Sequence, residues 1–354
     1  MLKIALVGCG RISVRHAQLL GSGTISGAEL CAVCDIVEQK AQQLGEKYSV
    51  PAFTDMHQMA EQTQPDVIVV LTESGNHARH VIELARHGKH IMVEKPMALA
   101  LSDADEMIRM CDQAQIKLFV VKQNRFNVPV KSLRAALEAG RFGKLVMGTV
   151  RVRWCRPQRY YDQDSWRGTW EMDGGVLTNQ ASHHVDLLEW MMGEVESVYA
   201  ITSTALVNIE AEDTAVVSVK FKNGALGIIE ATTATRPKDL EGSISILGEN
   251  GSVEIGGFAV NEIKVWQFVD PVPEDEDVKE KFSTNPPDVY GYGHQEYYQH
   301  VVAAVQGGSP NLVDGLEGRR SLELISAIYE SVETGQRVDL RFSPKKVRLG
   351  RKQG

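Results

Sequence analysis

The sequence predicts an α/β protein with an N-terminal doubly wound parallel sheet and a C-terminal α+β domain built on a large, open, mostly antiparallel sheet. Short apolar runs alternate with helical stretches over residues 1–121, which is typical of a parallel sheet covered by helices on both faces. From about residue 143 the apolar runs instead follow one another through glycine-containing turns. At 354 residues the chain is too long for one ordinary core, so two domains are expected.

In the first domain, 1–121, the expected strands are apolar runs dominated by Val, Ile and Leu. They cover residues 3–8, 29–35, 66–71, 90–96 and 117–121. Helices are expected between them at 15–20, 38–48 and 77–87. Right-handed crossovers then place the strands in one parallel sheet.

The second domain, 122–342, is expected to be richer in sheet. Its predicted strands are 144–154, 213–221, 225–233, 243–248, 252–255 and 262–268, and its predicted helices lie near 178–192, 294–306 and 317–333. Residues 270–293 are rich in proline, glycine and acidic residues, so a long loop is expected there. The basic segment 343–354 is expected to be a mobile tail.

The composition favours small-molecule chemistry. A formal net charge of -8 and an isoelectric point near 5.7 argue against nucleic-acid binding. Apolar runs such as 67–71 are far shorter than the roughly 20 residues that a bilayer requires. Five cysteines and the absence of a signal-peptide pattern indicate a cytoplasmic protein with free thiols. Neither the cysteines nor the ten histidines are spaced as metal ligands with carboxylates, so no metal site is expected.

The first strand ends in a glycine turn that indicates dinucleotide binding. Gly8 and Gly10 stand between this strand and the first helix, where backbone amides can approach a pyrophosphate. Ser13 occupies the position where a third Gly or Ala is usual. Asp35 ends the second strand, at the spacing of a carboxylate that binds the adenosine ribose and repels a 2'-phosphate, so NAD is favoured over NADP. A capping or solvated aspartate remains the alternative.

Two further groups of residues are candidates for the site. Lys95, at the end of the fourth strand and before Pro96, is aimed into the crevice where ligands bind such sheets, unless it forms a surface pair with Glu94. On the helix near 178–192, Asn179, His183 and Asp186 share one face, which either is solvated or lines a site.

The segment 151–167 has five arginines and two aspartates, a local excess of +3 in an acidic chain. Arg151 and Arg153 fit the solvated face of a strand. Arg156, Arg159 and Arg167 fall in a predicted loop and are the better candidates for binding an anion.

Taken together, these motifs resemble the glucose-fructose oxidoreductase and inositol dehydrogenase (Gfo/Idh/MocA) family, over the chain up to about residue 342. The family's helix pattern GGG..L.D.G.H..D falls on residues 174–186, with Asn179 in place of the usual Asp. Its TPNxxH motif falls on residues 72–77, where Glu73 and Ser74 are departures. The resemblance implies an NAD-dependent oxidoreductase acting on a sugar hydroxyl.

By this resemblance Lys95 and His183 are the catalytic pair. His183 has the residue type of a general base for the hydroxyl proton, and Lys95 would stabilise the developing negative charge. The resemblance implies that NAD is held by Gly8, Gly10, Arg11, Ile12, Asp35, Thr72, Ser74, His77, Glu94, Gln123, Trp166 and Arg167. Besides the catalytic pair, the expected substrate residues are Arg156, Arg159, Tyr160, Arg167, Asn179, Gln180 and Tyr292.

The string over residues 160–186 is most similar to the branch that oxidises the 3-hydroxyl of UDP-N-acetylglucosaminuronic acid for bacterial surface polysaccharides. The arginine excess supports a nucleotide sugar acid, because its negative charges need partners. Asn179 cannot titrate, so polyols fit less well. An inositol or simple-sugar dehydrogenase and a non-catalytic NAD-binding regulator remain the alternatives. As across the family, a homodimer or homotetramer through the C-terminal sheet is expected.

Overall fold

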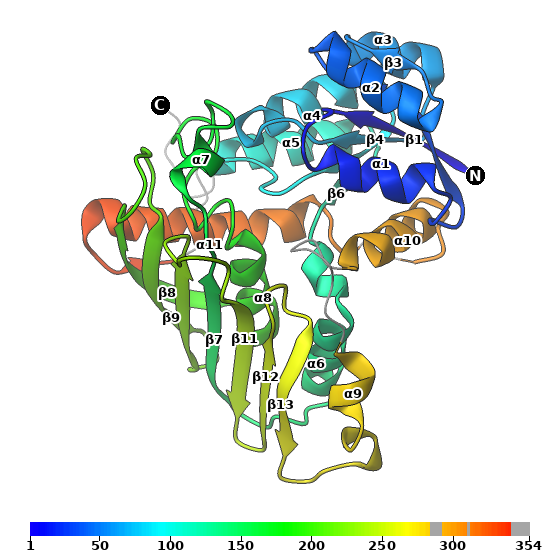
Figure 1. Cartoon of the computed structure of the whole chain (residues 1–354). Coiled ribbons are helices and arrows are strands. Elements are labelled where there is room, and N and C mark those ends of the chain that lie inside the picture. The colour runs from blue at the N-terminus through cyan, green and yellow to red at the C-terminus, as the bar shows by residue number, and fades with distance from the viewer. Residues whose placement is uncertain (284–291, 310–311, 341–354) are drawn as a thin grey trace, which may run out of the picture.

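The computed structural model describes residues 1–283, 292–309 and 312–340. Two sheets, each with its own hydrophobic core, make up these residues (Figure 1). Among them, no helix is both long enough and apolar enough to span a bilayer. The expected mobile tail, 343–354, lies outside the described residues.

The first sheet has six parallel strands in the order β3-β2-β1-β4-β5-β6. The strands are β1 Leu2–Val7, β2 Ala28–Cys34, β3 Ala52–Phe53, β4 Val67–Val70, β5 His90–Val93 and β6 Leu118–Val120. The helices of this part are α1 Ser13–Gly21, α2 Glu38–Tyr48, α3 Met56–Thr63, α4 His77–Ala85 and α5 Leu101–Gln113. All four residues of β4 are buried, so both faces of the sheet are covered, as continuous apolar runs require. The predicted doubly wound sheet is confirmed.

Sequence patterning missed α3, α5 and the short strand β3. Helix α3 is polar, and only Met59 and Ala60 are buried, but Asp55 caps its N-terminus by accepting two backbone N–H bonds. Helix α5 buries only the narrow stripe Ala104, Met107 and Cys111. Both helices therefore lack the wide apolar face that makes a helix visible in a sequence.

The second sheet has eight strands in the order β13-β12-β11-β7-β10-β9-β8-β14. They are β7 Leu145–Arg153, β8 Val195–Ser203, β9 Thr214–Phe221, β10 Leu226–Thr232, β11 Glu241–Gly248, β12 Gly251–Gly256, β13 Glu262–Phe268 and β14 Val338–Asp339. Among the described strands of this sheet only β7 and β10 pair in parallel, so the predicted mostly antiparallel sheet is confirmed. The expected loop 270–293 contains a short helix, α9 Val278–Phe282, and its residues 284–291 lie outside the described part.

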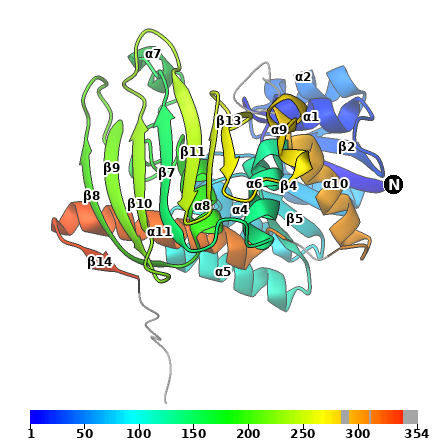
Figure 2. The same cartoon turned by 90° about the horizontal axis from the view of Figure 1, so that it is seen from below.

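One face of the second sheet is covered by helices and the other is open. The remaining helices are α6 Val128–Glu138, α7 Gln158–Tyr161, α8 Ser182–Met192, α10 Gly293–Val305 and α11 Gly315–Thr334, and short 3-10 turns are η1 Ser74–Asn76, η2 Gln123–Phe126 and η3 Pro273–Asp275. Residues of β9 alternate between buried and exposed. Figures 1 and 2 show α8 and α11 on the side toward the first sheet. The outer face carries no helix among the described residues.

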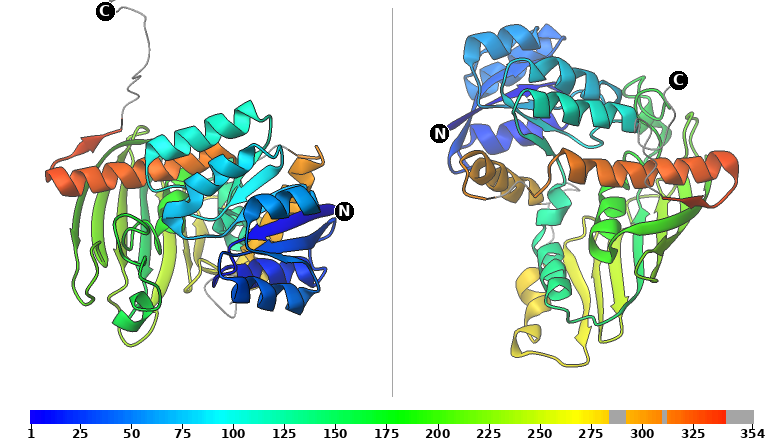
Figure 3. Two further views of the ribbon diagram at one scale, coloured as in Figure 1. Left: turned by 90° about the horizontal axis from the view of Figure 1, so that it is seen from above. Right: turned by 180° about the vertical axis from the view of Figure 1, so that it is seen from behind.

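Helices α10 and α11 join the two halves. Although α10 comes late in the chain, its Tyr297 and Tyr298 belong to the core of the first sheet, and Tyr297 donates to the Val120 carbonyl at 2.7 Å. Helix α11 contacts α5 and β6 of the first half and β8 of the second, and Figure 3 shows it running between the two sheets. The two halves are thereby held together.

Candidate active site

A cavity of about 820 Å³ lies at the carboxyl ends of β1, β2, β4 and β5, and the segment between β7 and α8 forms its other wall. Open α/β sheets bind ligands at this edge. Every predicted site residue except Arg159 and Tyr292 lines it. Arg159 lines an adjoining, more open hollow that shares Arg11, Arg156 and Tyr160 with the cavity. Tyr292 lines neither space and is 49% exposed.

The glycine turn after β1 has the shape that a pyrophosphate needs. Gly8 has a φ of +100°, and a Cβ there would lie 2.7 Å from the Leu71 backbone, so no larger residue fits. A Cβ on Gly10 would meet no protein atom within 4 Å, so its backbone is open to a ligand. Ser13 donates its hydroxyl hydrogen to the Gly10 carbonyl at 2.6 Å. The serine that departs from the usual glycine therefore closes the turn.

Asp35 lines the cavity and also holds the local backbone. Its two carboxylate oxygens accept the N–H groups of Cys9 at 2.7 Å and Val37 at 2.8 Å. Asp35 does not cap α2, whose N-cap is Val37, but these two backbone contacts fix its carboxylate at the cavity edge. An oxygen with remaining lone pairs is still able to accept ribose hydroxyls.

The side chain of Lys95, in the first half of the chain, contacts the second half. Its Nζ donates to the main-chain oxygen of Asn179 at 2.6 Å. Burial lowers the pKa of Lys95, while the charges of Glu94 and Asp173 act in the opposite direction. Glu94 lies in the interior rather than in a surface pair, because its carboxylate faces His16 and His294. Lys95 is therefore a cavity residue with its position fixed by the opposite wall.

His183 lies in the first turn of α8 and is almost fully buried. Its Nε2 lies 2.9 Å from the side-chain amide of Gln123. Burial first, and then the charge of Lys95, holds the pKa of His183 well below its usual range. The ring is therefore neutral near pH 7, which is the state that a proton acceptor requires.

Asp186 does not line the cavity, although the helical spacing suggested one shared face with His183. Its carboxylate accepts two hydrogen bonds from Arg125, both at 2.8 Å, and lies 3.1 Å from the Lys122 ammonium. All three side chains are buried. Asp186 therefore neutralises cations from the segment around η2 and docks α8 against it.

Guanidinium groups gather around Tyr160. Those of Arg11, Arg156 and Arg167 lie 5.9, 5.5 and 4.8 Å from its ring centroid, within cation–π range. Arg167 also donates to the Tyr160 hydroxyl at 3.0 Å and to Asp164. Because all of these arginines line the cavity, this guanidinium cluster gathers charged hydrogen-bond donors at one end of it.

Arg151 and Arg153 lie elsewhere, as the strand alternation indicated. Arg153 donates to Glu230 on β10 at 2.6 and 2.8 Å, and Arg151 lies 3.5 Å from Glu241 on β11. These cross-strand pairs sit on one face of the second sheet and are partly exposed. They neutralise two of the five arginine charges, while the guanidinium cluster faces the cavity.

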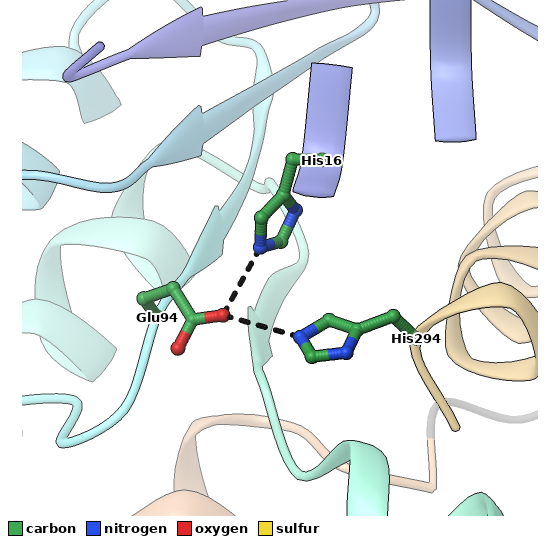
Figure 4. A group of neighbouring side chains, drawn as sticks. All are labelled: His16, Glu94 and His294. Atoms are coloured by element: carbon green, nitrogen blue, oxygen red, sulfur yellow. Dashed lines mark hydrogen bonds and ion pairs between the residues drawn. The ribbon is translucent and has the colours of Figure 1, made fainter. Parts of the chain in front are cut away.

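The cavity wall behind Lys95 contains a cluster that sequence spacing did not reveal. Glu94 Oε1 lies 3.0 Å from His16 Nε2 and 3.6 Å from His294 Nε2, and Figure 4 shows both rings pointing at this oxygen. Burial works against the Glu94 charge, but the two histidines outweigh it and hold the pKa of Glu94 well below its usual range. Tyr298 contacts His16 Nδ1 at 2.6 Å. Two histidines and a glutamate are also a ligand set that zinc accepts.

Other lining residues were also missed. The cavity is completed by Trp154, Gln163, Asp164 and His294, among others. Trp154 ends a predicted strand and Gln163 lies beside the arginines, so proximity in sequence could have indicated both. Nothing local marks His294, because it reaches the cavity only through the return of α10 to the first half.

Comparison with known proteins identifies the family. Residues 2–122 match the model of the oxidoreductase family's NAD-binding Rossmann fold, and residues 134–340 match that of its C-terminal alpha/beta domain, both of the Gfo/Idh/MocA family. The chain belongs to this family. The myo-inositol 2-dehydrogenase of Thermotoga maritima is 30% identical, over 96% of this chain and 98% of that one.

Two solved structures are more similar. The WlbA dehydrogenase of Bordetella pertussis, in complex with NADH and UDP-GlcNAcA, is 44% identical with a TM-score of 0.91, over 97% of this chain and 98% of that one. The WlbA dehydrogenase of Chromobacterium violaceum, in the same kind of complex, is 46% identical with a TM-score of 0.90, over 97% of each chain. The predicted family, NAD cofactor and class of enzyme, an NAD-dependent sugar dehydrogenase, are confirmed.

Proposed function

We propose that the chain oxidises the 3-hydroxyl of UDP-N-acetylglucosaminuronic acid to a ketone with reduction of NAD. The observation that carries this proposal is the guanidinium cluster around Tyr160, which shares one cavity with Lys95 and His183. Its guanidinium donors suit a ligand with a diphosphate and a carboxylate. The likeness to two dehydrogenases solved with UDP-GlcNAcA supports the same substrate.

The residues at the sheet edge fit the cofactor. Gly8 lets the turn pack against Leu71, Gly10 leaves the backbone open for a pyrophosphate, and Asp35 is held where it can accept the ribose hydroxyls. When bound there, NAD supplies the acceptor for the hydride that leaves the sugar carbon. The protein must then remove the hydroxyl proton and hold the ring in place.

His183 and Lys95 have different roles at the sugar hydroxyl. Neutral His183 takes the hydroxyl proton, so the C–O bond can become C=O as the carbon loses its hydride. Lys95, held by the Asn179 carbonyl, donates a hydrogen bond to the oxygen as its negative charge develops. The side-chain amide of Gln123 lies 2.9 Å from His183 Nε2 and fixes the orientation of the ring.

The guanidinium cluster holds the charged end of the substrate. Arg156 is anchored by Asp239 at 3.0 Å and Arg167 by Asp164 at 2.9 Å, so both guanidinium groups are presented in fixed positions. Bidentate contacts from such groups match phosphate and carboxylate oxygens. Uncharged polyols cannot use these contacts, so we expect them to be poor substrates.

The test is NADH absorbance on mixing the protein with NAD and UDP-N-acetylglucosaminuronic acid, UDP-N-acetylglucosamine, myo-inositol or glucose. Turnover of the sugar acid alone supports the proposal, and rapid oxidation of myo-inositol or glucose refutes it. Lys95→Ala and His183→Ala should each lower kcat by about 10²-fold or more while NAD still binds. Loss of NAD binding would instead make these residues structural, and silence with all four sugars would favour a non-catalytic NAD-binding protein.

The guanidinium cluster has its own test with a matched control. Arg156→Ala should raise KM for the sugar acid at least tenfold, because one charged hydrogen-bond donor is lost. Arg109→Ala removes the same charge from the exposed face of α5, where Arg109 pairs with Glu106, and should leave KM unchanged. Equal effects of both variants would assign the loss to net charge rather than to the cluster.

We also propose that the chain forms a homodimer or homotetramer through the outer face of the second sheet. Ile201 on β8 lies opposite Val216 on β9, and these side chains are 64% and 56% exposed. Leu226 and Ile228 on β10 extend this apolar surface. A second copy is the partner that suits it, since two such sheets can pack face to face. Light scattering measures the oligomeric state, and the Ile201→Lys variant should be monomeric.

Two further predictions about the chain become proposals here. We propose that 1–121 form the NAD-binding unit and 122–342 the substrate-binding and oligomerisation unit, with α10 docked on the first unit. We propose a cytoplasmic location, supported by five cysteines that are all free thiols in the structure. Fractionation of cells that express the tagged chain would test the location.

A further inference from the structure

Asp173 is a buried carboxylate in the wall of the site. It precedes the Gly174–Gly175 pair and is only 1% exposed. One of its oxygens, Oδ2, accepts the Gly168 N–H at 2.9 Å, and the other, Oδ1, accepts a short hydrogen bond from Nδ2 of Asn179. Both oxygens thus receive donors, and one of those donors belongs to a residue that lines the cavity.

These contacts fix the orientation of the Asn179 side chain. A carboxylate can only accept hydrogen bonds, so the NH2 group of Asn179 must face Asp173 and its Oδ1 must face away. Within the described residues Oδ1 has no hydrogen-bond partner, and Asn179 is partly exposed on the cavity wall. Its main-chain oxygen meanwhile accepts from Lys95 Nζ at 2.6 Å. Asn179 therefore offers one acceptor to Lys95 and another to a ligand.

Asp173 also balances charge at this wall. Lys95 lies among cations, because the charges of Arg156 and Arg167 act on its pKa in the lowering direction. The Glu94 carboxylate is engaged by His16 and His294. Burial raises the pKa of Asp173, and the Gly168 and Asn179 hydrogen bonds together with Lys95 favour its charged form. Asp173 is thus the anion on the side of the wall that faces Lys95 from the second half.

We propose that Asp173 is a positioning residue that holds the Asn179 carboxamide with its oxygen toward the cavity, where it accepts a hydrogen bond from a sugar-ring hydroxyl. This inference rests on the proposed sugar dehydrogenase function. It also gives the reason for the amide at position 179, since a carboxylate there would face Asp173 and repel it. Asp173 thus carries the negative charge of the Asp173–Asn179 pair, and Asn179 provides the acceptor for the sugar.

A charge-swap cycle tests this arrangement. Asp173→Asn leaves one oxygen for two donors, so either Gly168 or Asn179 loses its partner, and kcat/KM should fall ten- to hundredfold. Asn179→Asp brings two carboxylates together and should cost a similar factor. In the double variant the amide introduced at position 173 can accept from Gly168 and donate to the carboxylate introduced at position 179, which keeps a free oxygen toward the cavity. We expect it to recover at least tenfold over the worse single variant.

The pH profile separates positioning from a general loss of structure. In Asn179→Asp the two carboxylates can share a proton, which restores a donor and an acceptor. Its kcat/KM relative to the wild type should therefore rise as the pH falls from 8 to 6. Asp162→Asn, in the same segment but exposed and outside the cavity, is the control and should match the wild type. A single variant with unchanged kcat/KM, or a double variant no better than the singles, overturns the proposal.

The same cycle in urea needs no substrate. Each single variant should lower the unfolding midpoint, and the double variant should lie closer to the wild type than their summed effects predict. If the midpoint shifts of the two single variants simply add in the double variant, the role of Asp173 is overturned, whatever the enzyme oxidises. Coupled midpoints in a protein that oxidises no sugar would support the pairing and count against the proposed function alone.

Discussion

His184, the neighbour of the proposed base, makes the folded protein sensitive to acid. It is fully buried, its ring meets Trp154 edge-on with centroids 5.8 Å apart, and neither ring nitrogen has a hydrogen-bond partner among the described residues. Burial lowers the pKa of His184 to about 3. The folded protein therefore keeps His184 neutral at pH values where an exposed histidine is charged.

The sign and size of the effect follow from this pKa. Above pH 6.5 the ring is neutral in both states, so it makes no pH-dependent contribution. Between pH 6.5 and about 3 the unfolded chain takes up a proton that the folded chain does not, so stability falls as the pH falls. At about 1.4 kcal/mol per pH unit, the loss at pH 5 is about 2 kcal/mol, or roughly a thirtyfold change in the unfolding equilibrium.

The assay is urea unfolding of the wild type and His184→Leu at pH 7.5 and at pH 5, followed by tryptophan fluorescence. Leucine fills a similar volume without a titrating group, so the variant should lose about 2 kcal/mol less than the wild type over this interval. At pH 7.5 the two proteins should differ only by a packing offset. Parallel losses in both proteins would show that His184 is protonated in the folded state, and the reasoning from burial would be wrong.

Three other predictions concern the cavity. Asp35→Ser should weaken NAD binding about ten- to hundredfold and bring the affinity for NADP closer to that for NAD, as measured by calorimetry; an unchanged preference would leave Asp35 with its backbone role alone. Because the pKa of His183 lies well below 6.5, kcat/KM should show no inflection near pH 6.5, and such an inflection would contradict a neutral base. The His16, Glu94 and His294 cluster is held together by contacts between its own side chains, so chelation with EDTA should leave kcat unchanged, whereas stoichiometric zinc in the purified protein would assign it to a metal.

The sequence predicts most of the fold because apolar strands are conspicuous in it. Strands such as β4 are apolar throughout, and the glycine turn after β1 follows from one short motif. Helix α3 is not predicted because it buries only two side chains. Polar helices on the outside of a sheet leave too little hydrophobic pattern to find.

The candidate site is predictable where one local segment carries several of its residues. The segment 156–183 contributes most of one wall, and its arginines are visible as a charge excess. The pairing of His16 with His294 could not be predicted from a local pattern, because the two residues are 278 positions apart in the sequence. Their rings meet at the Glu94 carboxylate only in the folded chain. Asp173 could have been suspected from its place before the glycine pair, but only the hydrogen bond to Asn179 shows its use.

The return of α10 to the first sheet bears on how the protein is made. A ribosome completes the strands of this sheet long before it reaches Tyr297, Tyr298 and Val301, which fill the same core. Until then the Val120 carbonyl lacks the Tyr297 hydroxyl, and Glu94 lacks one of its two histidines. The first domain therefore cannot finish folding during synthesis of its own residues, and a fragment that stops after β6 would carry an open hydrophobic face. Maturation of the cofactor site is thereby tied to completion of nearly the whole chain.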